Sequence, residues 1–257
     1  MAEKAVIITG ASAGLGKELA QNYAKDGWKI GLIARRKDAI DQLKNELEIK
    51  YSVTVIAIAC DVSDKPAIFS AIESIIESFG RIDCVVANAG VGYSTPGYEP
   101  DADKLDLTIG INVLGAAYSA YAAIPTMLKQ NSGQLVVISS LAGYRGLPEA
   151  GSYCASKAAV NALFESMRLD LKKFNIAVSI IRPGYIKSNI TDRNEYYMPQ
   201  LQSTEKGVKK IYRAIQKKKK IYAFPKPLAN VVQSFYFWPT WLYDLIFAGL
   251  QKKKRDE

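Results

Sequence analysis

Tyr153 and Lys157 are the residues of this sequence whose types and spacing could do chemistry. They stand four positions apart, so a helix would place them on one face, about one turn from each other. An ammonium one turn from a phenol favours the phenolate and lowers the tyrosine pKa from its usual value of about 10. Such a tyrosine can donate or accept a proton near neutral pH, as the interconversion of a carbonyl and an alcohol requires. The spacing alone is common in helices, so its meaning depends on the surrounding elements.

The composition narrows the class of protein. The chain has 257 residues, of which 49% are hydrophobic and 23% charged, which suits one large α/β domain with a full core. It contains no histidine, which excludes Ser-His-Asp and Cys-His catalysis and any histidine-ligated metal. Cys60, Cys84 and Cys154 are scattered through apolar stretches, so we expect reduced core residues and no metal site. No signal peptide precedes the first apolar run, and we expect a cytoplasmic protein.

A glycine-rich turn follows the first predicted strand, residues 5–8. It contains Gly10, Gly14 and Gly16, and a helical pattern follows over residues 17–26. A strand, a glycine turn and a helix are typical of dinucleotide sites, where the backbone approaches the pyrophosphate and the helix N-terminus offers free N–H groups. The spacing is Gly-x-x-x-Gly-x-Gly and not Gly-x-Gly-x-x-Gly, and an ordinary glycine turn is the alternative.

The second predicted strand, residues 29–34, bears on the choice of cofactor. An NAD-specific site would normally have an acidic residue near this strand end, to bind the ribose 2′-hydroxyl. Here the strand ends at Ala34, and Arg35 and Arg36 follow. Because arginine forks pair well with phosphate, the sequence predicts NADP(H), with its 2′-phosphate. The alternative is that the two arginines are the solvated start of the helix predicted over residues 37–51.

The remaining strands alternate with helical patterns. This alternation predicts a parallel, doubly wound sheet of the Rossmann type in one α/β domain. The later strands are predicted at residues 54–59, 84–87, 134–138, 177–181 and 221–225.

Polar residues follow several of these strands. Ligands of open α/β sheets bind at the carboxyl edge, where Asn88 and Ser140 are expected. Asp61, at the same edge, could accept from an adenine amino group or could cap the next helix. Asn112 lies in an apolar helical stretch that ends at about residue 130, where a lone asparagine is usually satisfied internally.

These motifs, in this order and at this spacing, resemble those of the classical short-chain dehydrogenases/reductases over roughly residues 3–190. The matching motifs are Thr9-Gly10-x-x-x-Gly14-x-Gly16, Asp61-Val62, Asn88-Ala89-Gly90, Asn112-Val113, Ser139-Ser140, Tyr153-x-x-x-Lys157 and Arg182-Pro183-Gly184.

The resemblance implies a role for each residue of a catalytic tetrad. Tyr153 would be the general acid in reduction and the base in oxidation. Ser140 would hydrogen-bond the substrate oxygen and polarise it. Lys157 would lower the tyrosine pKa and bind the nicotinamide ribose, and Asn112 would hold a water that links Lys157 to solvent.

The cofactor-binding residues are predicted from the resemblance together with the two arginines. Ser188 stands where the family usually has threonine, and the hydroxyl is kept. The predicted residues are Gly10, Ser12, Gly14, Leu15, Gly16, Arg35, Arg36, Asp61, Val62, Asn88, Ala89, Gly90, Tyr153, Lys157, Pro183, Gly184, Ile186 and Ser188.

The end of the chain departs from the resemblance. We expect a domain over residues 1–227, with a mobile substrate lid at about 189–204, and an aromatic and basic extension over 228–257. The lid's Tyr196, Tyr197 and Met198 suggest an apolar substrate. Residues 206–257 contain 13 Lys and Arg against 3 Asp and Glu, and residues 1–205 contain 21 against 22. The net charge of +9 therefore belongs to the tail, which argues against a general nucleic-acid-binding surface.

Residues 228–250 approach the length of a bilayer span. Gln233, Pro239 and Asp244 interrupt them, and an aspartate near the centre of a span is costly. Two interpretations remain open. Residues 228–255 could be a peripheral membrane anchor, with aromatic bulk and flanking lysines, or an aromatic helix pair packed on the pocket or on a dimer partner.

The sequence thus predicts an NADP(H)-dependent oxidoreductase that interconverts a carbonyl and an alcohol by hydride transfer, on a hydrophobic lipid-like or steroid-like substrate. The alternatives are a broad carbonyl reductase or 3-hydroxy acid dehydrogenase of small polar substrates, and a cofactor-binding sensor without turnover. The family resemblance further implies a homo-oligomer, a dimer or a tetramer.

Overall fold

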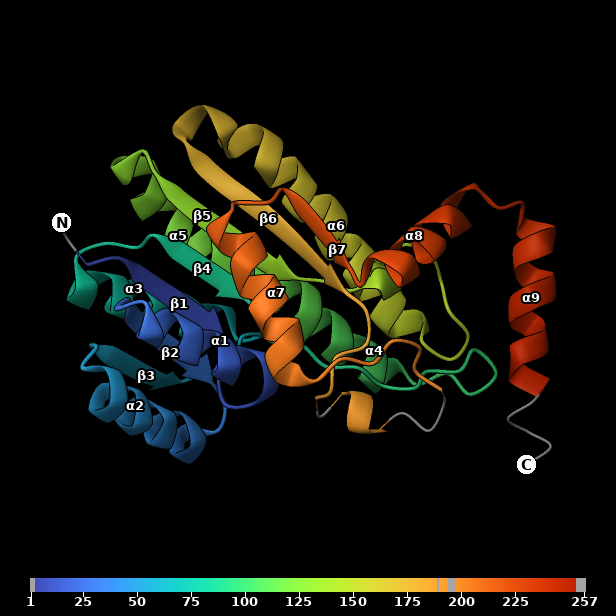
Figure 1. Cartoon of the computed structure of the whole chain (residues 1–257), viewed down its shortest axis with the longest axis horizontal. Coiled ribbons are helices and arrows are strands. Elements are labelled where there is room, and N and C mark those ends of the chain that lie inside the picture. Colours follow the sequence, from blue (N-terminus) through green and yellow to red (C-terminus); the bar gives the residue numbers. More distant parts are fainter. Residues whose placement is uncertain (1–2, 189, 194–196, 253–257) are drawn as a thin grey trace.

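The computed structural model describes residues 3–188, 190–193 and 197–252. Over these residues the chain forms a parallel seven-stranded sheet in the order β3-β2-β1-β4-β5-β6-β7 (Figure 1). The predicted Rossmann-type fold is confirmed. The strands are β1 (Ala5–Thr9), β2 (Lys29–Ala34), β3 (Val55–Ala59), β4 (Cys84–Ala87), β5 (Gly133–Ile138), β6 (Ile176–Pro183) and β7 (Ile221–Phe224).

Helices cover both faces of the sheet. One face packs against α1 (Gly14–Lys25), α2 (Lys37–Tyr51) and α7 (Thr204–Gln216). The other packs against α3 (Lys65–Phe79), α5 (Ala116–Gln130) and α6 (Gly151–Asp170). Because both faces are covered, the central strands are continuous apolar runs without alternation, and every residue of β1 is buried.

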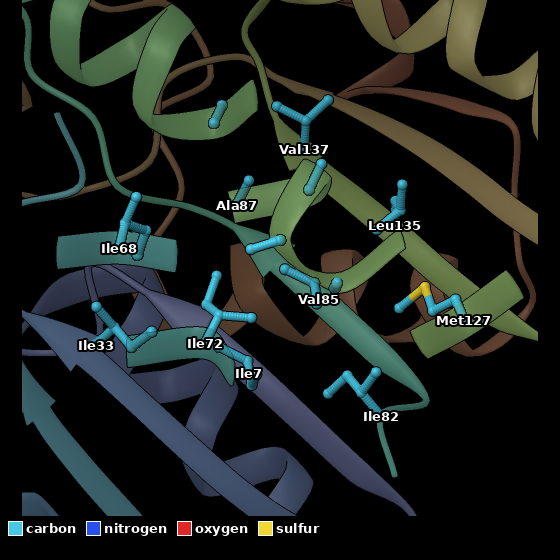
Figure 2. Packing of buried hydrophobic residues seen from close by; sticks show 14 of the residues in the cluster. Ile7, Ile33, Ile68, Ile72, Ile82, Val85, Ala87, Met127, Leu135 and Val137 are labelled. Atoms are coloured by element: carbon cyan, nitrogen blue, oxygen red, sulfur yellow. The ribbon is translucent and has the colours of Figure 1, made fainter. Parts of the chain in front are cut away.

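The packing follows the helical periodicity. Ile40, Leu43 and Leu47 of α2 recur at helical spacing and are buried under the sheet. Figure 2 shows the other face, where Ile72 of α3 lies near Ile7 of β1, and Met127 of α5 near Leu135 of β5. The two layers fix the strand ends against one another, and the carboxyl edge of the sheet becomes a rigid platform for a site.

The predicted helix that contains Asn112 extends over residues 102–130. Helix α4 (Ala102–Ile109) continues through a π-helical turn, Gly110–Gly115, into α5. Among the described residues, the stretch 102–130 is long and apolar enough to cross a membrane. Its most apolar window is 56% buried inside the protein, and α5 packs on α3, so we assign the stretch as a core helix.

The aromatic extension is not one continuous helix. It forms α8 (Lys226–Ser234), a 3-10 turn at Phe235–Phe237 and α9 (Thr240–Lys252). The helices separate at Pro239, whose ring cannot continue a helix from the preceding residue. Figure 1 shows α9 beside the layered body and on neither face of the sheet.

Candidate active site

A cleft of about 490 Å³ opens at the carboxyl edge of the sheet. It runs from the turn after β1 to the start of α6, so it brings together segments that are far apart in the sequence. Most of the predicted site residues line it; Gly16 and Asn112 do not. Those that do are Gly10, Ser12, Gly14, Leu15, Arg35, Arg36, Asp61, Val62, Asn88, Ala89, Gly90, Ser140, Tyr153, Lys157, Pro183, Gly184, Ile186 and Ser188.

The glycine turn is packed backbone against backbone. Gly10 has φ +66°, and a Cβ there would lie 2.8 Å from the Cα of Ala89. A Cβ on Gly16 would lie 2.4 Å from the Gly10 carbonyl oxygen. Glycine is therefore required at both positions, and Gly16 acts by letting α1 approach the turn.

The start of α1 fits a pyrophosphate. Its N-cap residue, Ala13, makes no side-chain cap bond, and the same is true of the N-cap residues of α2 and α6. Uncapped N–H groups and the positive end of the helix dipole together form an anion site. Ala13 and Gly14 both line the cleft, so the first turn of α1 borders the space where a phosphate would bind.

Asn88 acts on the turn itself. Its Nδ2 donates to the carbonyl oxygens of Thr9 at 2.9 Å and Gly10 at 3.3 Å. In return, Thr9 Oγ1 accepts from the backbone N–H groups of Asn88 and Ala89. These bonds tie the end of β4 to the glycine turn, so Asn88 fixes the position of the glycine turn.

The two predicted arginines have partners in the cleft. The Arg36 fork donates to Ser12 Oγ, with its Nη2 at 3.0 Å. Arg35 Nη1 lies 3.7 Å from an Asp61 carboxylate oxygen. Asp61 also accepts from the backbone N–H and hydroxyl of Ser63, at 3.0 Å and 2.7 Å. Burial raises the Asp61 pKa, but the bonds from Ser63 and the charge of Arg35 outweigh it, and the pKa is lowered.

The other end of the cleft holds the predicted acid–base pair. Tyr153 lies in the first turn of α6, and Lys157 one turn later, with its Nζ 5.6 Å from the Tyr153 ring centroid. The Lys157 side chain is buried, and its ammonium donates to the Ile138 carbonyl oxygen at 3.0 Å. Burial lowers the pKa of Lys157 to about 8.

Ser140 follows β5 and faces the same cleft. Its Oγ accepts from the backbone N–H of Ala142 at 3.1 Å. The hydroxyl oxygen is therefore held in place by the backbone, while its own proton can be donated to a substrate oxygen.

Asn112 lies behind the cleft in the π-helical turn. Its Oδ1 accepts from the Val91 N–H at 2.8 Å, and its Nδ2 donates to the Val91 carbonyl oxygen at 2.9 Å and to Ser156 Oγ at 3.0 Å. Ser156 in turn donates to the Tyr153 carbonyl oxygen. The side chain thus ties the segment after β4 to the helix that carries Tyr153. Ser156 connects Asn112 to Tyr153 and was not predicted as a site residue. Its position inside the Tyr-x-x-x-Lys motif is the sequence feature that could have indicated it.

The comparisons with known proteins agree with this geometry. Residues 4–197 match the family model described as short chain dehydrogenase. The chain belongs to the short-chain dehydrogenase family. An uncharacterized oxidoreductase of Myxococcus xanthus is 35% identical over 244 residues, which are 95% of this chain and 96% of that protein. The dehydrogenase/reductase SDR family member 7B of Bos taurus is 30% identical, over 97% of this chain and 82% of that protein.

Solved structures of this short-chain dehydrogenase family have the same fold. A short-chain dehydrogenase/reductase from Burkholderia phymatum in complex with NAD is 25% identical, with a TM-score of 0.81 over 90% of this chain and 92% of that chain. An alcohol dehydrogenase from Thermococcus sibiricus complexed with 5-hydroxy-NADP is 25% identical, with a TM-score of 0.78 over 86% of this chain and 95% of that chain. The protein is thus an oxidoreductase of a family that binds nicotinamide cofactors.

In this short-chain dehydrogenase, one wall of the cleft was not predicted. Gly92, Tyr93 and Ile190 line the cleft, and Gly92 lies beside the Tyr153 ring. A Cβ on Gly92 would lie 3.1 Å from Ile190 Cγ2 and 3.4 Å from the Tyr153 ring, so these residues meet. No local motif marks Gly92, Tyr93 or Ile190 in the sequence.

The segment of the predicted lid is described in part. Thr191–Arg193 form a 3-10 turn, and Thr191 Oγ1 accepts from the Ser188 N–H at 2.8 Å and donates to the Ile186 carbonyl oxygen at 3.0 Å. Tyr197 is exposed. Tyr196 lies outside the described residues, and the lid itself stays a prediction.

Proposed function

We propose that this short-chain dehydrogenase uses NADP(H) to interconvert a carbonyl and an alcohol by hydride transfer. The supporting observation is that Ser140, Tyr153 and Lys157 face one cleft that begins at the glycine turn of α1. When bound, the nicotinamide supplies the hydride, and the protein supplies position and electrostatics. The catalytic unit of this proposal is residues 1–227, with 228–257 as an extension.

The protein side of the reaction is a proton transfer. In reduction, the carbonyl carbon gains the hydride, and the oxygen gains a proton from the Tyr153 phenol. The Ser140 hydroxyl donates to the same oxygen as negative charge develops on it. The buried Lys157 ammonium stabilises the phenolate that remains and binds the ribose hydroxyls. In oxidation the phenolate removes the alcohol proton. Asn112 positions α6, and the water-holding role implied for it belongs to this proposal.

The choice of NADP(H) depends on the end of β2. Ala34 supplies no carboxylate for a ribose hydroxyl, and both Arg35 and Arg36 border the cleft. Arg36 and Ser12 are already hydrogen-bonded to each other, so a 2′-phosphate would meet a charged fork and a hydroxyl together. One solved relative contains an NADP derivative and another contains NAD, so the proposed preference of this chain depends on its own two arginines.

The proposed substrate is hydrophobic, lipid-like or steroid-like. Gly92 and Ile190 meet beside the Tyr153 ring, and Ile186 also lines the cleft. An apolar wall with few polar groups suits an apolar molecule whose single oxygen meets Ser140 and the phenol.

The proposed partners are a second copy of the chain and a membrane surface, which residues 228–255 contact peripherally from the cytoplasmic side. Three exposed apolar side chains recur at steps of seven from the end of the π-helical turn along α5. Seven residues are close to two α-helical turns, so these side chains share one side of the helix and form a stripe suited to a like helix. They are Leu114, Tyr121 and Leu128. Light scattering of Leu114→Gln should show a smaller species than wild type. An unchanged mass would show that this face is not the contact between copies of the chain.

The test is the consumption of NADPH and of NADH with carbonyls from short keto acids to steroid and long-chain ketones. Wild type, Tyr153→Phe and Tyr51→Phe are compared; Tyr51 lies at the end of α2, away from the cleft. We expect turnover of apolar ketones with NADPH, abolished in Tyr153→Phe and kept in Tyr51→Phe. NADPH binding, measured by fluorescence, should survive in both variants.

Each other outcome removes one part of the proposal. A preference for NADH would overturn the role of the arginines. Turnover of small polar substrates alone would overturn the substrate class. Cofactor binding without turnover in either direction would leave a sensor and overturn the enzyme.

A further inference from the structure

The C-terminal arm, defined as α8, the 3-10 turn and α9 (residues 226–252), has a small aromatic core of its own. The Phe235 ring centroid lies 4.8 Å from that of Trp238 and 5.3 Å from that of Phe247. Tyr243 stacks on Phe247 at 4.3 Å. Phe235 and Tyr243 are buried, so these rings hold the two helices of the arm together.

Arg145 fixes the arm to the body. Its guanidinium lies 3.8 Å from the Tyr243 ring centroid, and Nη1 donates to the carbonyl oxygens of Phe235 and, at 3.1 Å, Trp238. The Tyr243 hydroxyl donates to the Gly146 carbonyl oxygen. Arg145 and Gly146 belong to the loop between Ser140 and Tyr153, so the arm is held beside the catalytic end of the cleft.

The outer face of the arm, defined as Tyr236, Phe237, Trp241 and Leu245, is apolar and exposed. Their exposed fractions are 72%, 83%, 68% and 70%. Single exposed apolar residues are ordinary on a protein surface. Here the Tyr236 and Phe237 rings lie 6.1 Å apart, and Trp241 and Leu245 lie one turn apart on α9, so four large apolar side chains are exposed on one short stretch of the arm, as at an interaction site. The arm lies at the edge of the molecule (Figure 1), and no part of the described chain covers this face.

The chemistry of the patch favours a lipid surface. Tyrosine and tryptophan are enriched at the level of lipid headgroups. In the sequence, Lys253, Lys254 and Arg255 come directly after Lys252, the last residue of α9. Cationic runs next to an apolar helix face bind anionic headgroups. Asp244 is the one acidic residue between Lys226 and Lys252. The other basic run, 217–220, lies at the amino end of β7, whereas the arm begins after the carboxyl end of that strand, so this run takes no part.

We propose that the outer face of the arm docks on an anionic lipid surface, with its rings among the headgroups, and that the positive charge of the sequence 252–255 favours anionic headgroups over neutral ones. This assigns a face and a headgroup charge to the membrane contact in the proposed function. The docking rests on the proposed enzymatic function only for its biological purpose. That purpose is to bring the catalytic end of the cleft close to apolar substrates in the membrane. The contacts of Arg145 with Phe235, Trp238 and Tyr243 set the orientation of the arm relative to the cleft.

The experiment is co-sedimentation of the full chain with vesicles of phosphatidylcholine plus phosphatidylglycerol, and with phosphatidylcholine alone. The arm variant is Phe237→Ser with Trp241→Ser and Leu245→Ser. Its matched control is Ile49→Ser with Leu169→Ser, two side chains that are also largely exposed, at 85% and 68%, on α2 and α6. A third variant changes the four residues 252–255 to glutamine.

We expect wild type and the control to sediment with the anionic vesicles, more weakly at high salt. The arm variant and the glutamine variant should each bind at least about tenfold more weakly. Inorganic phosphate should not displace the protein, because the apolar face supplies part of the binding.

Three results would overturn the docking proposal. The first is that wild type does not sediment with anionic vesicles, and the second is that the arm variant and the control lose vesicle binding equally. The third is that the arm variant has a smaller mass in solution and still binds vesicles, which would make the face a contact between copies of the chain. Turnover of a soluble ketone without vesicles should be unchanged in the arm variant. A failure of docking is therefore separable from a failure of the proposed enzyme.

Discussion

The glycine turn of the cleft and the C-terminal arm are held to the same body in different ways. At the turn, backbone meets backbone, and a single added carbon on Gly16 would stand 2.4 Å from the Gly10 oxygen. The arm is held by side chains, chiefly Arg145 and Tyr243, and its outer face remains exposed. Close backbone packing leaves few alternatives in sequence or structure, whereas a side-chain clasp can be opened by one substitution. Substitutions in the cleft should therefore cost activity, cofactor binding or stability, whereas a substitution at Arg145 should act mainly on the arm.

Lys157→Met should lower turnover by a factor of at least about 100, since it removes the charge that supports the Tyr153 phenolate. It should also change how the stability of the cofactor-free enzyme depends on pH. Burial lowers the pKa of Lys157 to about 8, below its unfolded value of about 10.5. The unfolded chain therefore binds more protons between these two values, and wild-type stability rises with pH across that window.

The measurement is the free energy of unfolding of wild type and Lys157→Met between pH 7 and pH 9.5. At pH 7 the buried ammonium costs wild type roughly 3 kcal/mol, and by pH 9.5 about half of that cost is gone. The difference between the two proteins should narrow accordingly. A difference that stays constant with pH would show that burial does not perturb this lysine.

Gly16→Ala should weaken NADPH binding and destabilise the fold by about 1–3 kcal/mol, because the new carbon meets backbone that cannot move aside. Gly97→Ala is the control, since nothing lies within 4 Å of a Cβ built there. Chemical denaturation and NADPH titration measure the two effects. If both alanine variants behave alike, the close approach of α1 to the turn is not what the cleft requires.

Arg36→Ala should raise the KM for NADPH roughly tenfold and leave that for NADH nearly unchanged, because only NADPH carries the 2′-phosphate that the fork would bind. Lys37→Ala removes the same charge from the neighbouring residue, whose ammonium pairs with Asp41 on the helix surface. Steady-state kinetics with both cofactors separate a specific contact from a general loss of positive charge. If the two variants raise the KM for NADPH equally, the effect comes from the lost charge and not from a contact with the 2′-phosphate.

Arg145→Met should have the smallest effect on the fold, a loss of about 1–2 kcal/mol from the ring contact and two hydrogen bonds. Its larger consequence should be local, as faster chymotrypsin cleavage within the arm. Arg145→Lys keeps a cation over Tyr243 but loses the fork to two carbonyl oxygens, so it should fall between wild type and Arg145→Met. Cleavage at the wild-type rate in both variants would show that the arm does not depend on this clasp.

Local patterns determined much of the fold and most of the proposed site. The predicted strands 29–34 and 84–87 and the predicted helix 37–51 match β2, β4 and α2 residue for residue. The hydrophobic periodicity of a helix and the composition of a strand can be read from residues that are neighbours in the chain. The carboxyl ends of parallel strands must lie at the same edge of the sheet. The glycine turn, Ser140 and the Tyr153–Lys157 pair could therefore be placed in one cleft from the sequence alone.

Only the tertiary structure decided how these groups are supported. Nothing near Asn112 in the sequence shows that a π-helical turn would aim it at Val91 and Ser156. Arg145 is an ordinary loop arginine until the chain returns some 90 residues later to place Phe235 and Tyr243 against it. The wall formed by Gly92 and Ile190 arises in the same way. Such contacts depend on where distant segments finally lie, and that is set by the packing of the whole sheet and its helices, which no local pattern records.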